Sequence, residues 1–153
     1  MKFILSICAI GISFLISYLR CEGLRRAEEI TEFMHKFCDK MIKNNYSEML
    51  PIHELFSQTY NEAFNTQISL KSTSETLEFI QNLLDCVPDN EHLIELITNF
   101  NKAGASEISN VEGELLKATS ESISIAKKHY TDRGKTSFII YPSLTALAVL
   151  ILI

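Results

Sequence analysis

The chain of 153 residues contains no tryptophan, three prolines and five glycines. Only two of the glycines, Gly104 and Gly113, lie between residues 24 and 124, and no Asn-Gly or comparable hairpin dipeptide occurs in that stretch. Tight β-hairpins favour such dipeptides, and half-buried strands show a regular apolar–polar alternation that no segment here displays. The sequence therefore argues against a β-sheet fold.

Motifs for catalysis, metal binding and phosphate binding are also missing. The pair His53-Glu54 is not followed by a second histidine at the spacing that a zinc peptidase needs. His35 and Cys38 are three positions apart, but a zinc site needs three or four ligands and no second pair is present. No Gly-x-Ser-x-Gly and no glycine-rich phosphate loop occurs. We therefore expect no enzymatic activity, no metal and no cofactor.

Charge is absent from a long run near the N-terminus. Lys2 is followed by an uncharged run over residues 3–19, rich in isoleucine, leucine and phenylalanine. A positive start, an apolar stretch and then small residues form the layout of a secretory signal. The small-x-small site Cys21-Glu22-Gly23 predicts cleavage that leaves Leu24 as the first mature residue. Cleavage after Cys21 and an uncleaved anchor are the alternatives.

Charge is also absent from the C-terminal run TSFIIYPSLTALAVLILI. Its apolar part, residues 138–153, is shorter than the roughly 20 residues that a spanning helix needs, and it has no basic residue after it. Preceded by a polar spacer at 127–137, it has the order of a glycosylphosphatidylinositol (GPI) attachment signal. Ser124, with Ala126 two positions on, is the expected attachment residue, and Asp132 is the alternative. A short spanning helix and a buried terminal helix are the competing interpretations.

These signals divide the chain into a signal peptide at 1–23, a domain at 24–124 and a propeptide at 125–153. Six of the 14 basic residues and two of the 19 acidic residues lie outside the domain, which leaves it eight basic and 17 acidic residues and a net charge of −9. Bulk electrostatics does not draw such a domain to nucleic acid or to anionic lipid. We therefore expect no nucleic-acid partner.

Within the domain, apolar residues recur in steps of three and four, as on the buried face of an amphipathic helix. These stripes predict helices over residues 24–44, 51–68, 72–87, 90–103 and 106–125. Ser72, with Glu75 three positions on, forms a capping box at the start of the third. The expected fold is an all-α bundle of four to five short amphipathic helices. The residues expected to be buried are Phe37, Phe56, Phe64, Leu83, Leu96 and Ile97; Ile125 ends the fifth stripe.

Two modifications are predicted in this domain. Cys38 and Cys86 are its two cysteines, and an even count in an exported domain favours a disulfide, with two buried free thiols as the alternative. Such a bond would add about 3–4 kcal/mol by the chain-entropy model. The sequon Asn45-Tyr46-Ser47 falls in the expected first loop and predicts N-glycosylation of Asn45.

The order of signal, small acidic helical domain and apolar tail resembles the small GPI-anchored surface antigens of blood-cell-invading protozoan parasites. The richness in asparagine, isoleucine, lysine and serine, without tryptophan, fits such a source. The resemblance covers the architecture and both end signals. It implies display on a plasma membrane and contact with host cells or host antibodies.

We accordingly expect a non-enzymatic protein that a lipid anchor holds on the outer leaflet of the plasma membrane, where it displays the bundle for adhesion or antigenic display. One competing hypothesis is a helical module that binds a small apolar ligand. Another is a single-pass membrane protein with a C-terminal span. An enclosed cavity would favour the ligand-binding module, and a filled core with an exposed apolar patch would favour adhesion.

Overall fold

The computed structural model describes residues 2–47, 50–87, 90–102 and 108–152. No strand occurs among these residues, so the predicted all-α class is confirmed. The elements in chain order are α1 (Lys2–Ser47), α2 (Ile52–Phe64), α3 (Thr73–Leu84), α4 (Glu91–Lys102), α5 (Ile108–His129), the π-helical turn η1 (Tyr130–Gly134) and α6 (Lys135–Leu152).

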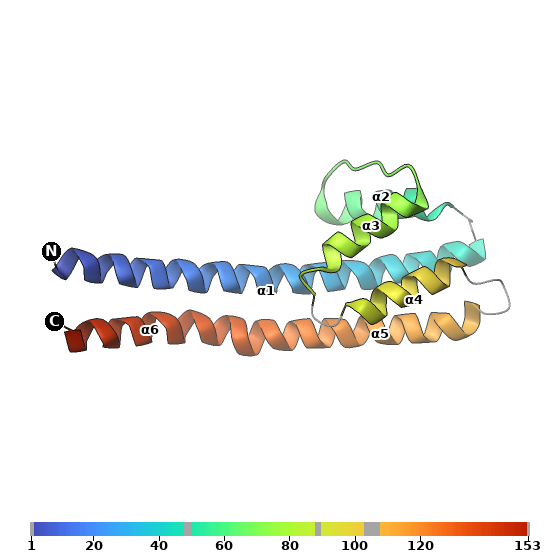
Figure 1. Ribbon diagram of the computed structural model, residues 1–153. Coiled ribbons are helices and arrows are strands. Elements are labelled where there is room, and N and C mark those ends of the chain that lie inside the picture. The colour runs from blue at the N-terminus through green and yellow to red at the C-terminus, as the bar shows by residue number, and fades with distance from the viewer. Residues whose placement is uncertain (1, 48–49, 88–89, 103–107, 153) are drawn as a thin grey trace.

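Two long antiparallel rods form the frame of the molecule (Figure 1). One rod is α1, and the other is α5 continued through η1 into α6, so the two chain ends lie together at one end of the frame. Helices α2, α3 and α4 pack beside the half of the frame that is far from the chain ends. We call that far end, where α1 ends and α5 begins, the distal end.

The expectation that all helices are short is wrong for α1, which runs for 46 residues across the predicted cleavage site. Gly23 alone does not break it, and Arg25 makes two ion pairs along the helix surface, one of which, with Glu22, spans the site. Its guanidinium lies 2.6 Å from Glu22 and 2.8 Å from Glu29, at spacings of three and four residues. Pairs at these spacings stabilise a helix.

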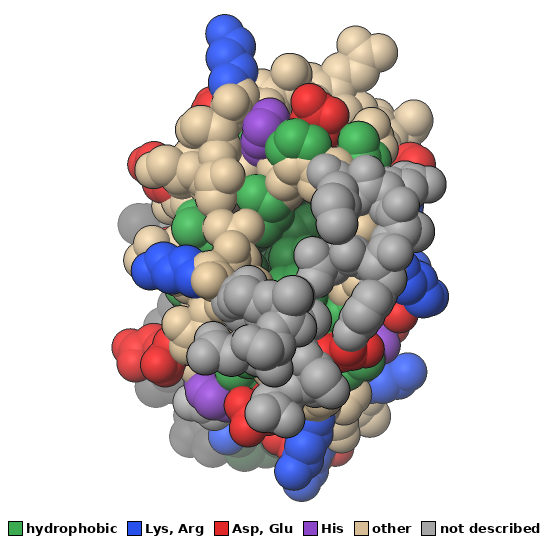
Figure 2. Space-filling view, turned by 90° about the vertical axis from the view of Figure 1, so that its right-hand side faces the viewer, with side chains coloured by type: hydrophobic (Ala, Val, Ile, Leu, Met, Phe, Trp, Pro, Cys, Tyr) green, Lys and Arg blue, Asp and Glu red, His purple; other side chains and the backbone are tan. Residues whose placement is uncertain are grey.

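The distal end is closed by side chains of three helices. Hydrophobic side chains appear near the middle of this face, and charged side chains of both signs lie around its rim (Figure 2). A small hollow of about 120 Å³ lies here between Met41 and Asn44 of α1, Ile52 and Leu55 of α2, and Phe100 of α4. The core thus extends to the distal end of the bundle.

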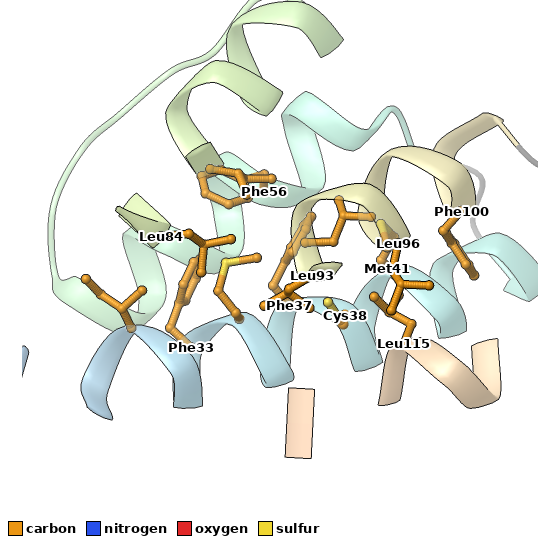
Figure 3. Close-up of a cluster of buried hydrophobic side chains, with 14 of the residues drawn as sticks. Phe33, Phe37, Cys38, Met41, Phe56, Leu84, Leu93, Leu96, Phe100 and Leu115 are labelled. Atoms are coloured by element: carbon orange, nitrogen blue, oxygen red, sulfur yellow. The ribbon is translucent and has the colours of Figure 1, made fainter. Parts of the chain in front are cut away.

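The core gathers on one face of α1 between Ala27 and Ile42, where α2, α3, α4 and α5 cover it (Figure 3). Of the six predicted core residues, four are buried: Phe37, Phe56, Leu96 and Ile97. The other two, Phe64 and Leu83, are only half-buried. Phe64 is the last residue of α2, so it reaches the edge of the core rather than its centre.

Aromatic rings join α1 to α2. The ring centroids of Phe37 and Phe56 are 4.9 Å apart at 80°, and those of Phe33 and Tyr60 are 5.4 Å apart at 89°. This edge-to-face geometry places the positive rim of one ring on the negative face of the other, and each such pair contributes about 0.5–1.5 kcal/mol beyond the burial of its area. Phe79 of α3 extends the cluster with a centroid 5.3 Å from that of Tyr60.

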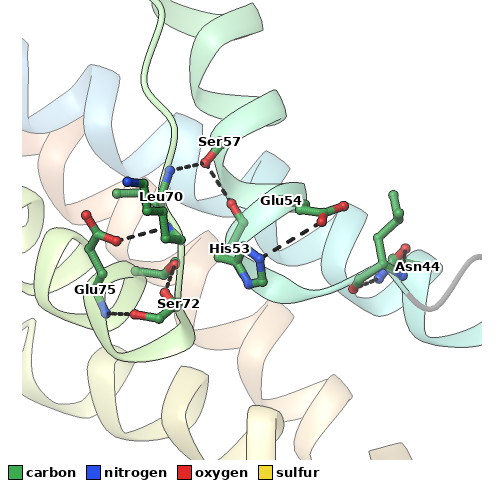
Figure 4. A network of polar contacts seen from close by, with 10 residues as sticks. Asn44, His53, Glu54, Ser57, Leu70, Ser72 and Glu75 are labelled. Carbon is green, nitrogen blue, oxygen red and sulfur yellow. Dashed lines mark hydrogen bonds and ion pairs between the residues drawn. The ribbon is translucent and has the colours of Figure 1, made fainter.

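Polar side chains fix the connection between α2 and α3 (Figure 4). The predicted cap is confirmed at Ser72, whose hydroxyl accepts a hydrogen bond from the Glu75 amide at 3.2 Å. The Glu75 carboxylate accepts one from the Lys71 amide at 2.9 Å, one residue earlier than in the usual capping box. Farther back, the Leu70 amide donates to the Ser57 hydroxyl at 3.1 Å. The connection is therefore held by hydrogen bonds to its own backbone.

The difference between the buried and the half-buried phenylalanines generates a prediction. In a fragment spanning residues 24–129, Phe37→Ala should lower the free energy of unfolding by about 3–5 kcal/mol, because Phe37 is fully buried. Phe64→Ala, the matched control, should lower it less, by about 1–2 kcal/mol, because Phe64 is only partly buried at the edge of the core. Urea unfolding followed by circular dichroism measures both, and equal losses would contradict the assigned helix faces.

Candidate membrane-anchoring site

The exposed large hydrophobic side chains of the described residues gather on two segments. Apart from Ile125, all of them belong to α1 before Arg20 or to α6. The set comprises Ile7, Ile12, Phe14, Leu15, Ile16, Tyr18, Leu19, Phe138, Ile139, Ile140, Tyr141, Leu144, Leu147 and Leu150. We call these two segments, residues 6–19 and 136–150, the terminal helix pair. A surface so apolar is unfavourable in water and suits contact with lipid.

Small hydroxyl side chains fill the seam between the two segments. Ser13 and Ser17, one turn apart on α1, are 9% and 0% exposed. The Thr145 hydroxyl lies 2.9 Å from the Ser13 hydroxyl, and the Ser17 hydroxyl lies 3.3 Å from the Ser137 carbonyl oxygen. The Ser17 hydroxyl also lies 2.9 Å from the Ser13 carbonyl oxygen of its own helix, and the Thr145 hydroxyl lies 2.9 Å from the Tyr141 carbonyl oxygen. The seam therefore holds hydroxyl groups, whereas the large side chains exposed on the pair are apolar or tyrosine.

The seam ends at a contact between Arg20 and Tyr141. An Nη1 atom of Arg20 donates to the Tyr141 hydroxyl at 2.8 Å, and the guanidinium carbon lies 5.9 Å from the centre of the Tyr141 ring. Helical side chains point toward the N-terminus of their helix, so these two, on antiparallel helices, point toward each other. Arginine and tyrosine at the end of an apolar helix are typical of the membrane–water interface.

By length and composition, α1 is the one helix of the described part that could cross a membrane, with a mean hydropathy of 1.5 in its most apolar stretch. An export signal has the same properties. The finding agrees with both interpretations of the N-terminal run, a cleaved signal and a retained anchor.

The π-helical turn η1 brings the predicted processing sites together. Gly134 is buried, and a Cβ atom there would lie 3.3 Å from the Tyr130 side chain and 3.6 Å from that of Leu24. A side chain at this position would crowd Tyr130 of the same turn, whereas the atoms of α1 lie at ordinary van der Waals distance. The predicted cleavage point before Leu24 thus lies beside Gly134. Gly134 in turn follows the alternative attachment residue, Asp132, by two positions.

Both candidate attachment residues are helical and exposed. Ser124 lies on α5, and Ala126, two positions on, is only 2% exposed, because this face of α5 packs into the molecule. Transfer of a lipid to Ser124 therefore requires the end of α5 to unwind. Asp132 lies in η1, and a π-helical turn is less stable than an α-helical one. Ile125, predicted to face the core, is 38% exposed, because the adjacent Ala126 takes the inward position.

The predicted disulfide between Cys38 and Cys86 is not formed in this structure, where all the cysteines are free. Cys38 is fully buried in the cluster of Figure 3, near Leu93 and Leu115. Cys86 is exposed just beyond α3, and its thiol donates to the Leu83 carbonyl at 3.3 Å. An even number of cysteines does not tell whether the two side chains point toward each other. Here the Cys38 thiol fills the core as a small apolar group, and the Cys86 thiol faces solvent.

The other singled-out polar residues serve helix packing or lie at helix ends. His35 Nδ1 lies 2.8 Å from the Thr119 hydroxyl, which donates to the Leu116 carbonyl at 3.0 Å, so His35 joins α1 to α5 and is not paired with Cys38. Among the described residues, no group of three or more His, Cys, Asp or Glu side chains could hold a metal ion. Asn45 lies in the last turn of α1, near the distal end, rather than in a loop.

Several features escaped the sequence interpretation. The stripes did not include Thr119, although it is 1% exposed, because a threonine gives no apolar signal. Ser13 and Ser17 sit within an apolar run and were counted only as uncharged. Their spacing of four residues, which is one turn, was the available signal for a helix seam.

Comparison of the chain with protein-family models, with curated proteins and with solved structures gave no match.

Thiol chemistry tests the placement of the two cysteines. Burial raises the pKa of Cys38 to about 12, and partial burial also raises the pKa of Cys86. The thiolate is the reactive form, so Cys38 stays protonated and inaccessible at pH 8. In the folded 24–129 fragment at pH 8, iodoacetamide should modify Cys86 and leave Cys38 unmodified until urea unfolds the fragment. Peptide mass spectrometry reads both sites. Equal modification of the folded protein at the two cysteines, or a bond between them, would contradict the structure.

Proposed function

We propose that the chain is the precursor of a non-enzymatic cell-surface protein, held by a GPI lipid on the outer leaflet of the plasma membrane, that presents the acidic bundle for adhesion or antigenic display. One observation carries the proposal: the exposed large hydrophobic side chains of the described residues lie on the terminal helix pair, with Ile125 as the one exception. The parts of the chain that suit a membrane are thereby separated from the part that suits water.

The antiparallel packing of α1 and α5 supports this role. Leu24, the predicted first residue, precedes the core-forming part of α1, and Ser124, the predicted lipid-bearing residue, lies near the C-terminal end of α5, so antiparallel packing brings them toward the same end of the bundle. A lipid attached there directs the distal end away from the membrane. Asn45, the predicted glycan site, then lies far from the membrane, where an exported chain is accessible.

The surface of the bundle indicates the kind of contact it makes. Among the described residues of 24–124, no large hydrophobic side chain is exposed, so the apolar patch that would favour adhesion is absent there. With a net charge of −9, polar and acidic side chains must supply the contact with a protein partner. The open hollow of about 500 Å³ beside Phe33 and Phe64 has a rim of Glu29, Glu32 and Lys36, which suits an apolar ligand poorly.

A second candidate is favoured by the packed seam itself: both terminal helices are kept as a two-helix membrane anchor. In that form, the basic residues next to the two membrane helices are unevenly distributed. Lys2 is the one at the end that carries the chain ends, whereas seven lie on the side of the bundle: Arg20, Arg25, Arg26, Lys127, Lys128, Arg133 and Lys135. The positive-inside rule would then place the bundle in the cytoplasm. The two candidates therefore predict opposite sides of the membrane for the same bundle.

Surface release decides between them. A phospholipase specific for the GPI anchor should release the wild-type protein from intact cells, and the released form should carry a glycan on Asn45. Leu147→Asp with Leu150→Asp should abolish release, because two charges in the tail prevent its recognition as an attachment signal. Gln58→Asp with Gln81→Asp, two exposed bundle residues given the same added charge, is the control and should be released normally.

Two results would overturn the proposal. One is wild-type protein that stays on the cell after the phospholipase and is detected there by an antibody against its C-terminal residues. The other is a bundle that external protease cannot reach and that carries no glycan, as expected for the two-helix anchor.

A further inference from the structure

We propose that, in the precursor, the N-terminal apolar helix and the tail helix bind each other inside the bilayer as an antiparallel hairpin, joined by the hydroxyl seam and surrounded by lipid acyl chains. The inference rests on the proposed function in one respect only, that both helices enter the membrane. It adds a partner for the tail: the leader of the same chain.

The polarity of the pair is the first argument. Every large side chain of the pair that is exposed is apolar or tyrosine, whereas Ser13 and Ser17 are buried in the seam. Thr145 lies against Ser13, and the Ser137 carbonyl lies against Ser17. Lipid offers no hydrogen bonds, so hydroxyls in a bilayer are satisfied by their own helix or by a neighbouring one. Small residues also let two helices approach closely, which is how helices associate where apolar burial gives no advantage.

Length and alignment are the second argument. The uncharged runs 3–19 and 138–153 are of nearly equal length, and at 1.5 Å per residue each extends roughly 25 Å, somewhat less than the roughly 30 Å of the hydrocarbon core. They lie level with each other, since Phe14 contacts Phe138 with ring centroids 6.2 Å apart and Ser13 meets Thr145. Neither helix extends past the other into the lipid.

The surface hollow along the seam fits lipid as well. It measures about 430 Å³ and is lined by Ala9, Ile12, Ser13, Ile16, Tyr141 and Thr145. Apolar atoms dominate its lining, unlike the charged hollows on the bundle. A flexible acyl chain fills such an open apolar groove, whereas water in it would gain few hydrogen bonds.

The tail gains most from the pairing. Pro142 lies inside α6, lacks an N–H and so leaves a carbonyl of the preceding turn without its helical partner. Such a proline is tolerated in a membrane where a neighbouring helix packs against it, and Pro142 is buried. A short helix with a proline is a marginal span alone, and the leader supplies the packing surface that stabilises it in the bilayer.

Cysteine cross-linking in the full-length precursor tests the hairpin. Ser13→Cys with Thr145→Cys replaces two hydroxyls that are 2.9 Å apart. The background carries Cys8→Ser, Cys21→Ser and Cys86→Ser, so that no other accessible thiol competes, and Gly23→Leu to prevent leader cleavage. A side chain added at Gly23 meets no atom within 4 Å, so the helix tolerates it. The precursor is translated into microsomes and oxidised, and the bundle is then cut by protease in detergent.

The expected result is a covalent N-terminal–C-terminal fragment pair on a non-reducing gel that separates on reduction. Leu15→Cys with Leu144→Cys, at similar depth but both 58% exposed and facing outward, is the matched control and should give at least about tenfold less product. Equal yields from the two pairs, or no product from the seam pair, would overturn the hairpin.

A second variant, in which the seam is filled by larger side chains, tests the hairpin without cysteines at Ser13 and Thr145. Ser13→Leu with Ser17→Leu keeps the leader apolar enough to insert but removes the space and the hydroxyls of the seam. In that variant, a cross-link between Phe14→Cys and Phe138→Cys should be lost, whereas it forms when Ser13 and Ser17 are intact. An unchanged yield would contradict a specific seam.

The cross-link reports on the precursor before lipid attachment, because attachment removes residues 125–153 and with them the cysteine at position 145. If the chain receives no GPI lipid, the cross-link still forms whenever the hairpin exists. If the hairpin does not exist, wild-type protein is still released from cells by the phospholipase. Failure of one proposal is thus distinguishable from failure of the other.

Discussion

The buried face of α1 between Ala27 and Ile42 is the surface on which the rest of the bundle depends. Helices α2, α3 and α5 contact α1, and α4 packs against α5 and α3, so that the core closes around this face. Its central rings, Phe33 and Phe37, meet Phe56 of α2 edge to face. The short helices have too few residues to be stable alone in water, and packing against this face stabilises them.

The same helix reverses its polarity near Arg20. Beyond this point α1 buries large apolar side chains and exposes charged ones, and before it α1 buries serines and exposes isoleucine, leucine and phenylalanine. A single solvent cannot favour both arrangements, because apolar surface is driven out of water and unpaired hydroxyls are driven out of lipid. One continuous helix thus has a part that suits lipid and a part that suits water, and the ion pairs of Arg25 lie just beyond the boundary between them.

The bundle was largely predictable because its helices bury one regular face. In the first predicted helix, the apolar residues that recur in steps of three and four are all buried: Ala27, Ile30, Met34, Phe37, Cys38 and Met41. Positions at the ends of helices were less predictable: Phe64 and Leu83 belong to stripes but reach the edge of the core, since periodicity does not tell where packing stops. The thiols of Cys38 and Cys86 illustrate a different limit. Their number favoured a bond, but only the three-dimensional packing determines that one points inward and the other outward.

The candidate site was predictable only as two apolar runs. Composition showed that both ends suit lipid, but not that they lie side by side, because a contact between residues 13 and 145 depends on how the bundle between them folds. The contact of Gly134 in η1 with Leu24 could not be predicted either, because it also joins residues that are far apart in the sequence.

The antiparallel arrangement of α1 and α5 has a mechanical consequence. A tether at the C-terminal end of α5 pulls one rod toward the membrane, whereas a partner bound at the distal corner of α1 pulls the other rod away from it. The load then acts along both helix axes as shear, and contacts such as that of His35 with Thr119 share it simultaneously. Two helices loaded in shear resist separation better than two helices that are unzipped one turn at a time. The antiparallel arrangement therefore suits a surface protein that must withstand pulling.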